Sequence, residues 1–209
     1  MKLGRLRLRF SVGGFFVGHG TQKLFGWFGG NGLEATGQMF EQGLGLRPGK
    51  RHALAAGAAE AGGGALLVLG AATPIAASVI TATMITAIQR AHLTKGPWVS
   101  SGGYEYNVVL IAAVLALAET GPGSPSVDSA SGSTAYGPKW AALALALGIL
   151  GAAGAHAINE AVPAPVVPAP AEQPVPAVPA AVAEASAPAD QPEPAAAPEA
   201  SGEQPEAAA

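Results

Sequence analysis

The chain has 209 residues, a formal net charge of −3 and no cysteine. Without cysteine it can form neither a disulfide nor a thiolate metal site, and it cannot itself carry sulfur in thiol or persulfide chemistry. All 11 Lys and Arg residues precede Trp140, whereas eight of the 14 acids lie from Glu160 onward. The bases lie on short loops beside apolar segments and form no basic stripe interleaved with aromatics, which argues against nucleic-acid binding.

Apolar segments in the first 160 residues predict membrane-spanning helices, each of which needs about 20 residues to cross roughly 30 Å of hydrocarbon. The first, residues 8–28, has no small-residue cleavage site and is interpreted as a retained signal anchor. Residues 53–91 are too long for one crossing, and Thr73-Pro74 marks a second helix start inside them. Residues 104–119 could span or re-enter, and residues 140–158 have the length of one crossing.

These segments predict an all-α fold, a transmembrane bundle of four core helices plus a fifth. Residues 1–128 are expected to form the four-helix membrane domain, and residues 129–160 a linker with the additional transmembrane helix. The loop between the first two spans suits a short amphipathic element at the membrane interface. Residues 161–209 are mostly Ala, Pro, Val and isolated acids, so we expect a disordered tail.

Orientation is weakly encoded, because five bases would lie on each side of the membrane. Four bases are clustered at the N-terminal end of the first span, and the first helix usually dominates. We therefore expect the N-terminus inside the cell and, with five spans, the tail outside. The chain is therefore expected to cross its membrane several times.

Three polar side chains share one face of the first span: His19, Gln22 and Lys23 have i, i+3 and i+4 spacing. Lys23 lies near the end of the span and could simply anchor at the interface. His19 lies deeper, where a hydrogen-bonded packing role and a functional role are both open. The face is therefore a candidate ligand or proton site.

Glu60 lies about two turns inside the second span, where an ionised carboxylate costs about 2.5 to 3.5 kcal/mol or more unless it is paired or hydrated. His19 or Lys23 is the expected partner. Gly57 and Gly64 share the face of Glu60, so another helix backbone can approach closely there. The pair could be structural, or it could handle protons or bind a ligand.

Further candidates follow on the third and fourth spans. Gln89 and His92 lie on a weakly polar face, and Glu105 could pair with Arg90 or Lys95. No motif in the sequence predicts a metal site. We therefore carry Gln89, His92 and Glu105 as candidate ligand or proton residues, and expect no metal.

Five short Gly-rich motifs occur in a characteristic order: residues 19–32, 60–70, 91–96, 102–107 and 121–128. In this order and spacing the chain resembles the DoxX family. The resemblance covers about residues 6–128 and implies a four-span bacterial membrane protein associated with quinone-linked oxidoreductases and oxidative-stress complexes. It implies no established common reaction, and nothing carries over to the fifth span or the tail.

A quinone is a candidate ligand, with no covalently bound cofactor expected. Its carbonyls need donors such as His19 or Gln22, its ring needs aromatic walls such as Phe25 or Trp27, and its reduction needs a proton route such as Glu60. The chain has no dinucleotide fingerprint, so electrons would come from a partner subunit or a bound quinone.

Three functions stay open at this point. The first is a cofactor-free membrane subunit of a quinone-linked or oxidative-stress oxidoreductase complex, more a non-catalytic subunit than a stand-alone enzyme. The alternatives are a membrane scaffold or envelope protein, and a conductor of protons or small solutes. Expected partners are the lipid bilayer, redox partner proteins and a second copy of the chain, but no nucleic acid.

Overall fold

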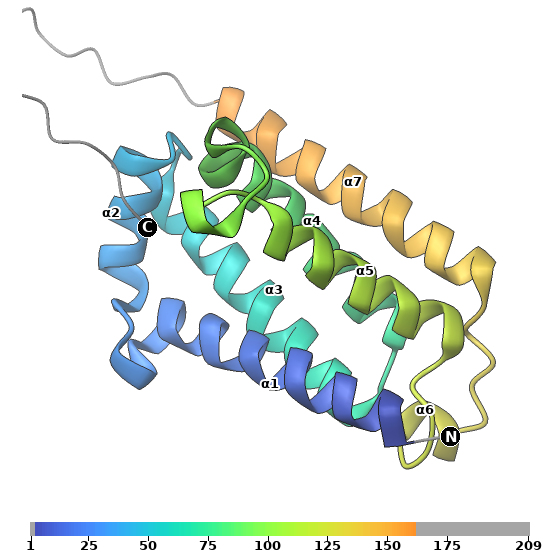
Figure 1. Ribbon diagram of the computed structural model, residues 1–209. Coiled ribbons are helices and arrows are strands. Elements are labelled where there is room, and N and C mark those ends of the chain that lie inside the picture. The colour runs from blue at the N-terminus through green and yellow to red at the C-terminus, as the bar shows by residue number, and fades with distance from the viewer. Residues whose placement is uncertain (1–2, 162–209) are drawn as a thin grey trace, which may run out of the picture. The chain divides into compact units, whose positions relative to one another are not determined.

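The computed structural model describes residues 3–161, which contain helices and connecting turns but no strand (Figure 1). The elements are α1 Leu3–Phe25, α2 Gly32–Gly43, α3 Gly49–Leu69, α4 Thr73–Ala87, α5 Glu105–Thr120, α6 Val127–Ala130 and α7 Pro138–Glu160. The predicted all-α bundle, four core helices and a fifth, is confirmed. The predicted disordered tail lies outside the described residues, apart from Ala161.

The five long helices differ in how well each could cross a membrane alone. By length and composition, two of the helices in the described part of the chain qualify, α3 and α7. The α1 helix is long enough at 23 residues but carries three arginines, and α4 and α5 have only 15 and 16 residues. A π-helical turn, Ile88–His92, continues α4, so the chain stays helical well beyond Ala87.

The bounds differ from the sequence prediction at two places. The first helix begins at Leu3 and ends at Phe25, because Gly26 adopts a left-handed conformation with φ 73° and turns the chain into the short 3-10 helix Trp27–Gly29. The α3 helix begins at Gly49 rather than at residue 53. It begins there because Pro48, directly before it, has an extended conformation with ψ 128°. The expected amphipathic element is present as α2.

The turn between α3 and α4 is held by a distant carboxylate. Ala72 has a left-handed φ of 45°, and the N–H groups of Ala72 and Thr73 donate to the Asp128 carboxylate at 2.8 and 3.1 Å. The Thr73 hydroxyl donates to the same carboxylate at 2.8 Å. Asp128 therefore satisfies the first free N–H groups of α4, although it lies 55 residues away in sequence. The predicted helix start at Thr73-Pro74 is confirmed.

Glycines bring α1 and α3 into close antiparallel contact. A Cβ atom added to Gly13 would lie 2.6 Å from the carbonyl oxygen of Gly64, and one added to Gly64 would lie 2.6 Å from that of Gly13. One heptad along, a Cβ atom added to Gly20 would lie 2.6 Å from the carbonyl oxygen of Gly57, whereas one added to Gly57 would first meet the Leu24 side chain at 2.8 Å. Because no side chain separates the backbones, α1 and α3 pack more tightly than helices with larger residues at the contact could.

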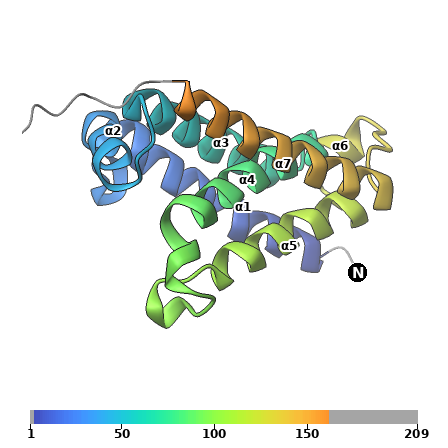
Figure 2. The same ribbon diagram turned by 90° about the horizontal axis from the view of Figure 1, so that it is seen from above.

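The main core surrounds α4, which contacts α3, α5 and α7 (Figure 2). Its fully buried apolar members include Leu67, Ile80, Val114 and Leu117. On α7, small residues face α4, and large residues such as Leu150 are exposed on the other side. That exposed apolar face fits a helix in contact with lipid.

Candidate functional site

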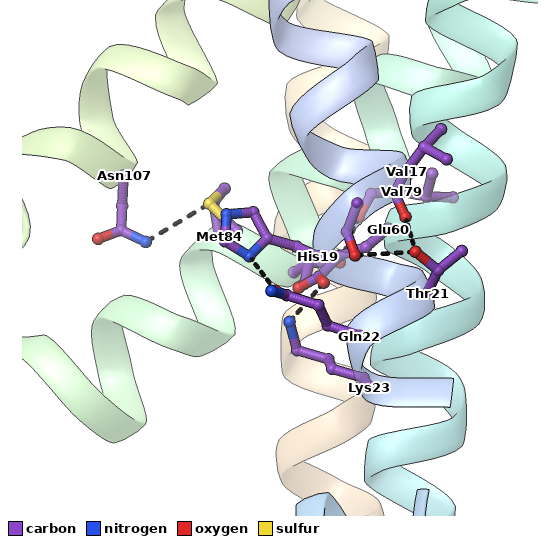
Figure 3. Close-up of polar contacts among 11 residues, drawn as sticks. Val17, His19, Thr21, Gln22, Lys23, Glu60, Val79, Met84 and Asn107 are labelled. Atoms are coloured by element: carbon purple, nitrogen blue, oxygen red, sulfur yellow. Dashed lines mark hydrogen bonds and ion pairs between the residues drawn. The ribbon is translucent and has the colours of Figure 1, made fainter. Parts of the chain in front are cut away.

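A buried ion pair joins α1 to α3. The Nζ atom of Lys23 lies 2.5 Å from Oε2 of Glu60, and the two side chains are 22% and 6% exposed (Figure 3). The expected pairing of Glu60 with the polar face of α1 is therefore present, and Lys23 is the partner. Because α1 and α3 approach so closely at Gly20 and Gly57, the lysine needs no long reach to meet the carboxylate.

This ion pair lines a cavity of about 470 Å³. Its walls come from α1, α2 and the segment that follows it, α3, α4 with its π-helical turn, α5 and α7. The lining residues are mostly apolar, and the polar or aromatic ones include Phe15, Phe16, His19, Lys23, Phe40, His52, Glu60, Thr83, Thr86, Arg90, His92, Tyr106 and Asn107. A mostly apolar pocket of this size with a few polar groups is typical of a small-molecule site.

His19 lines the cavity with its orientation set by Gln22. The Nδ1 atom of His19 lies 3.2 Å from Oε1 of Gln22 (Figure 3). Nε2 of Gln22 donates to the carbonyl of Phe28 at 3.3 Å. With its amide N–H so engaged, Gln22 presents its oxygen to the imidazole, which places the His19 proton on Nδ1. Gln22 does not itself line the cavity, so it positions His19 rather than facing a ligand.

Two more imidazoles line the cavity. His92, a predicted site residue, lies with Nδ1 2.7 Å from the carbonyl of Gly102. His52 lies with Nε2 3.1 Å from the carbonyl of Arg47. Because a carbonyl only accepts, each of these nitrogens carries a proton, and the other nitrogen of each neutral ring remains an acceptor. His52 was missed because the sequence prediction placed the helix start one residue after it.

Asn107 was also missed. It is 8% exposed, and Nδ2 donates to the thioether Sδ of Met84 at 3.4 Å (Figure 3). The signal in the sequence is that Asn107 directly precedes the apolar run 108–118 of α5, so a buried amide at the start of that run needs a reason.

Several predicted residues lie away from the cavity. Gln89 is exposed and, like Glu105, does not line it. No ion pair between Glu105 and Arg90 or Lys95 occurs among residues 3–161, and Arg90 instead donates to Nδ1 of His156 on α7. The suggested ion pair of Glu105 with Arg90 or Lys95 is therefore wrong. The physical reason is that α7, which packs on α4, offers Arg90 a nearer acceptor.

The expected aromatic walls also need correction. Phe25 and Trp27 pack on each other with ring centroids 5.3 Å apart, are both largely exposed, and do not line the cavity. Gly26 turns the chain at this point and points both rings away from the bundle. Aromatic walls come instead from Phe15 and Phe16 on α1, with Phe40 and Tyr106 from α2 and α5.

Within the described part of the chain, no group of three or more His, Asp or Glu side chains is placed to hold a metal ion. The three cavity imidazoles come from α1, α3 and the π-helical turn and are not gathered at one point. What the arrangement can do chemically is bind a small, largely apolar molecule and offer it hydrogen bonds and a proton.

Comparison with known proteins gives one match. The family model for DoxX matches residues 4–93, which hold α1 to α4, the π-helical turn and the Lys23–Glu60 pair. No curated protein and no solved structure matches the chain. The helices α5, α6 and α7 lie beyond the matched segment, so Asn107 and the α7 wall of the cavity carry no family information. Residues 4–93 are therefore a DoxX segment, and the chain is a small integral membrane protein.

Proposed function

We propose that this protein is a multi-pass subunit of an oxidoreductase complex in a bacterial plasma membrane, and that it binds a quinone in the cavity beside Lys23 and Glu60. The observation that carries the proposal is the buried Lys23–Glu60 pair, which opens on an apolar cavity of about 470 Å³. A buried charged pair is expensive to keep unless it has a role, since an apolar pair of the same size is often as stable.

The residues that line the cavity fit the head group of a quinone. Lys23 has three donors, of which Glu60 takes one, so the others can donate to a carbonyl oxygen. Phe16 and Tyr106 provide aromatic surface for a flat ring. The volume suits a ring with short substituents, and a longer apolar chain would extend between helices into lipid.

A bound quinone supplies the capacity to carry two electrons and two protons. The chain has no cysteine and no dinucleotide fingerprint, so in this proposal the electrons come from a redox-active partner protein. Within this chain, Lys23 and Glu60 hold a proton between them next to the cavity. His19, held in place by Gln22, offers a hydrogen bond to a molecule in the cavity. These are positioning and proton-holding roles, consistent with a subunit that does not work alone.

Conduction of protons or solutes is a weaker candidate. A conductor needs a polar route that continues to both sides of the membrane. Beyond the cavity, toward the N-terminal end of α1, the bundle is filled by fully buried apolar residues such as Leu67, Ile80 and Leu117. The described residues therefore favour a cavity that binds over a path that conducts.

The test is quinone binding by the full-length protein in lipid nanodiscs, with decylubiquinone and a short-chain menaquinone as probes. We expect saturable binding that Lys23→Met weakens about tenfold or more, because a charge-assisted hydrogen bond is worth about 1.5 to 3 kcal/mol. Lys50→Met is the matched control, because Lys50 pairs with Glu34 on the exposed surface and lines no part of the cavity. Equal affinity in both variants, or no saturation in the wild type, would overturn the proposal.

A further inference from the structure

We infer that Asn107 is a second ligand-binding group of the cavity, on the α5 wall, and that it binds the end of the ligand farther from Lys23. This inference rests on the proposed function, since it names a further residue of the same site. The ligand class it implies is a flat, uncharged molecule with an oxygen atom at each of two ends of an apolar body.

The amide of Asn107 has unused hydrogen-bonding capacity although it is more than nine-tenths buried. A thioether is a weak acceptor, and it is the acceptor that the described residues give to Nδ2. Within residues 3–161 no hydrogen bond to the amide oxygen is present, and this oxygen is not one of the fully enclosed atoms left without a partner, so it keeps surface open to the cavity that Asn107 lines. A ligand in the cavity would supply the missing hydrogen bonds of the amide, because Asn107 lines the cavity.

A purely structural role for Asn107 fits the surroundings poorly. It lies in the first turn of α5, yet its side chain makes no capping bond to the backbone of that turn. Its neighbours along the cavity wall, Leu110 and Met84, are apolar, and an apolar side chain of similar size would pack there without an unsatisfied amide.

The two ends of the site differ in the hydrogen bonds they can make. The Lys23 ammonium only donates, so it favours a carbonyl oxygen. The amide of Asn107 can donate from Nδ2 or accept at Oδ1, so it can bind either a carbonyl or a hydroxyl group. Loss of Asn107 should therefore weaken a quinone and its quinol by similar factors, whereas loss of Lys23 should weaken the quinone more.

The experiment measures dissociation constants for decylubiquinone and, under anaerobic conditions, its quinol, with full-length protein in nanodiscs. We expect Asn107→Leu to weaken both by about three- to tenfold, the value of one net hydrogen bond. Gln89→Leu is the matched control, because Gln89 is an exposed amide outside the cavity. The thermal stability of the ligand-free protein should not fall in Asn107→Leu. If the amide had a structural role, its loss would lower that stability. If Asn107→Leu does not insert, Asn107→Ala removes the same polar atoms without added bulk.

The outcomes separate this inference from the proposed function. If Lys23→Met weakens binding and both Asn107 variants bind like the wild type, Asn107 is not a ligand group and the quinone site stands without it. A lower stability in Asn107→Leu with unchanged affinity would make the residue structural. If the wild type binds neither the quinone nor the quinol, both proposals fail together, and this result differs from the other two.

Discussion

Lys23 and Glu60 are each tolerable in the membrane because the other is present. A lysine near the end of a span can extend to the interface, but Glu60 lies in the middle of α3 and cannot. With Glu60 almost fully buried, its carboxylate depends on the ammonium 2.5 Å away. The cost of removing either partner is therefore the cost of leaving the other charge unpaired, and this cost greatly exceeds what a surface pair contributes.

We expect Glu60→Ala to lower the free energy of unfolding by about 3 to 5 kcal/mol. Glu60→Gln should preserve membrane insertion and lose less, because the amide can still accept a hydrogen bond from Lys23. Thermal or chemical unfolding in detergent measures the effect. Glu34→Ala is the control and should cost less than about 1 kcal/mol, because the Glu34–Lys50 pair is exposed. A loss in Glu60→Ala no larger than this control would show that the buried pair contributes little.

Coupling within the pair is a separate question that the double variant answers. If the double variant Glu60→Gln with Lys23→Met lowers the free energy of unfolding by as much as the sum of the two single changes, the side chains do not act as a unit. A smaller combined loss means that each single change mainly exposes the unpaired partner.

At the level of elements, α1 and α3 are one packed unit because glycines bring their backbones together at Gly13–Gly64 and Gly20–Gly57. The same helix, α3, also carries a glycine that faces open space: a Cβ atom added to Gly62 would meet nothing within 4 Å. The position of a glycine therefore decides whether it is needed for the packing of α3 on α1, and Gly62 is a control within the same helix.

Gly64→Ala should destabilise the protein by about 1 to 3 kcal/mol, because its methyl group would push against the Gly13 carbonyl and force α1 away from α3. It should also weaken quinone binding by moving Lys23 away from Glu60. Gly62→Ala should be neutral or slightly stabilising, since alanine is the better helix former and space is available. Unfolding measured on both variants tests this, and equal stabilities would mean that the close contact is not needed.

Apolar run length and one proline were enough to predict the long helices, since hydrophobic spans leave strong signals and Thr73-Pro74 fixes a helix start. The pairing of Glu60 also followed from one energetic rule, that a buried charge needs a partner. Arg90 could not be assigned in this way, because its acceptor lies on α7, 66 residues on. That His52 and Asn107 line one cavity with Glu60 follows only from tertiary packing, which brings α3 and α5 to the same site.

For the whole molecule, the described residues separate into two ends. One end holds the N-terminus of α1, the α3–α4 turn and the loop from α5 to α7, which Asp128 and Arg9 tie together. The other end holds α2 and the loop between α4 and α5. The cavity reaches toward this second end, where Leu44 and Leu46 line it. Orientation in the membrane therefore decides from which side a partner protein could approach the site.

Cysteines introduced one at a time into this cysteine-free chain test the orientation. We expect Ser100→Cys, in the exposed loop before α5, to react with an impermeant reagent in intact cells. Ser131→Cys, exposed at the opposite end, should react only after lysis. Ser201→Cys, in the tail outside the described residues, should behave like Ser100→Cys if five spans are crossed. The reverse pattern for Ser100 and Ser131 would place the N-terminus outside.

The carboxylate of Asp128 has a consequence for the order in which the protein is assembled during synthesis. The first N–H groups of α4 receive their acceptor from a residue that leaves the ribosome 55 positions later. Until then the turn between α3 and α4, in which Ala72 has a left-handed conformation in the complete protein, has no carboxylate to cap α4. The hairpin is completed only when α5 has been made and the following loop folds back onto it, so the last step in fixing the early helices depends on chain that comes after the segment matched to the family.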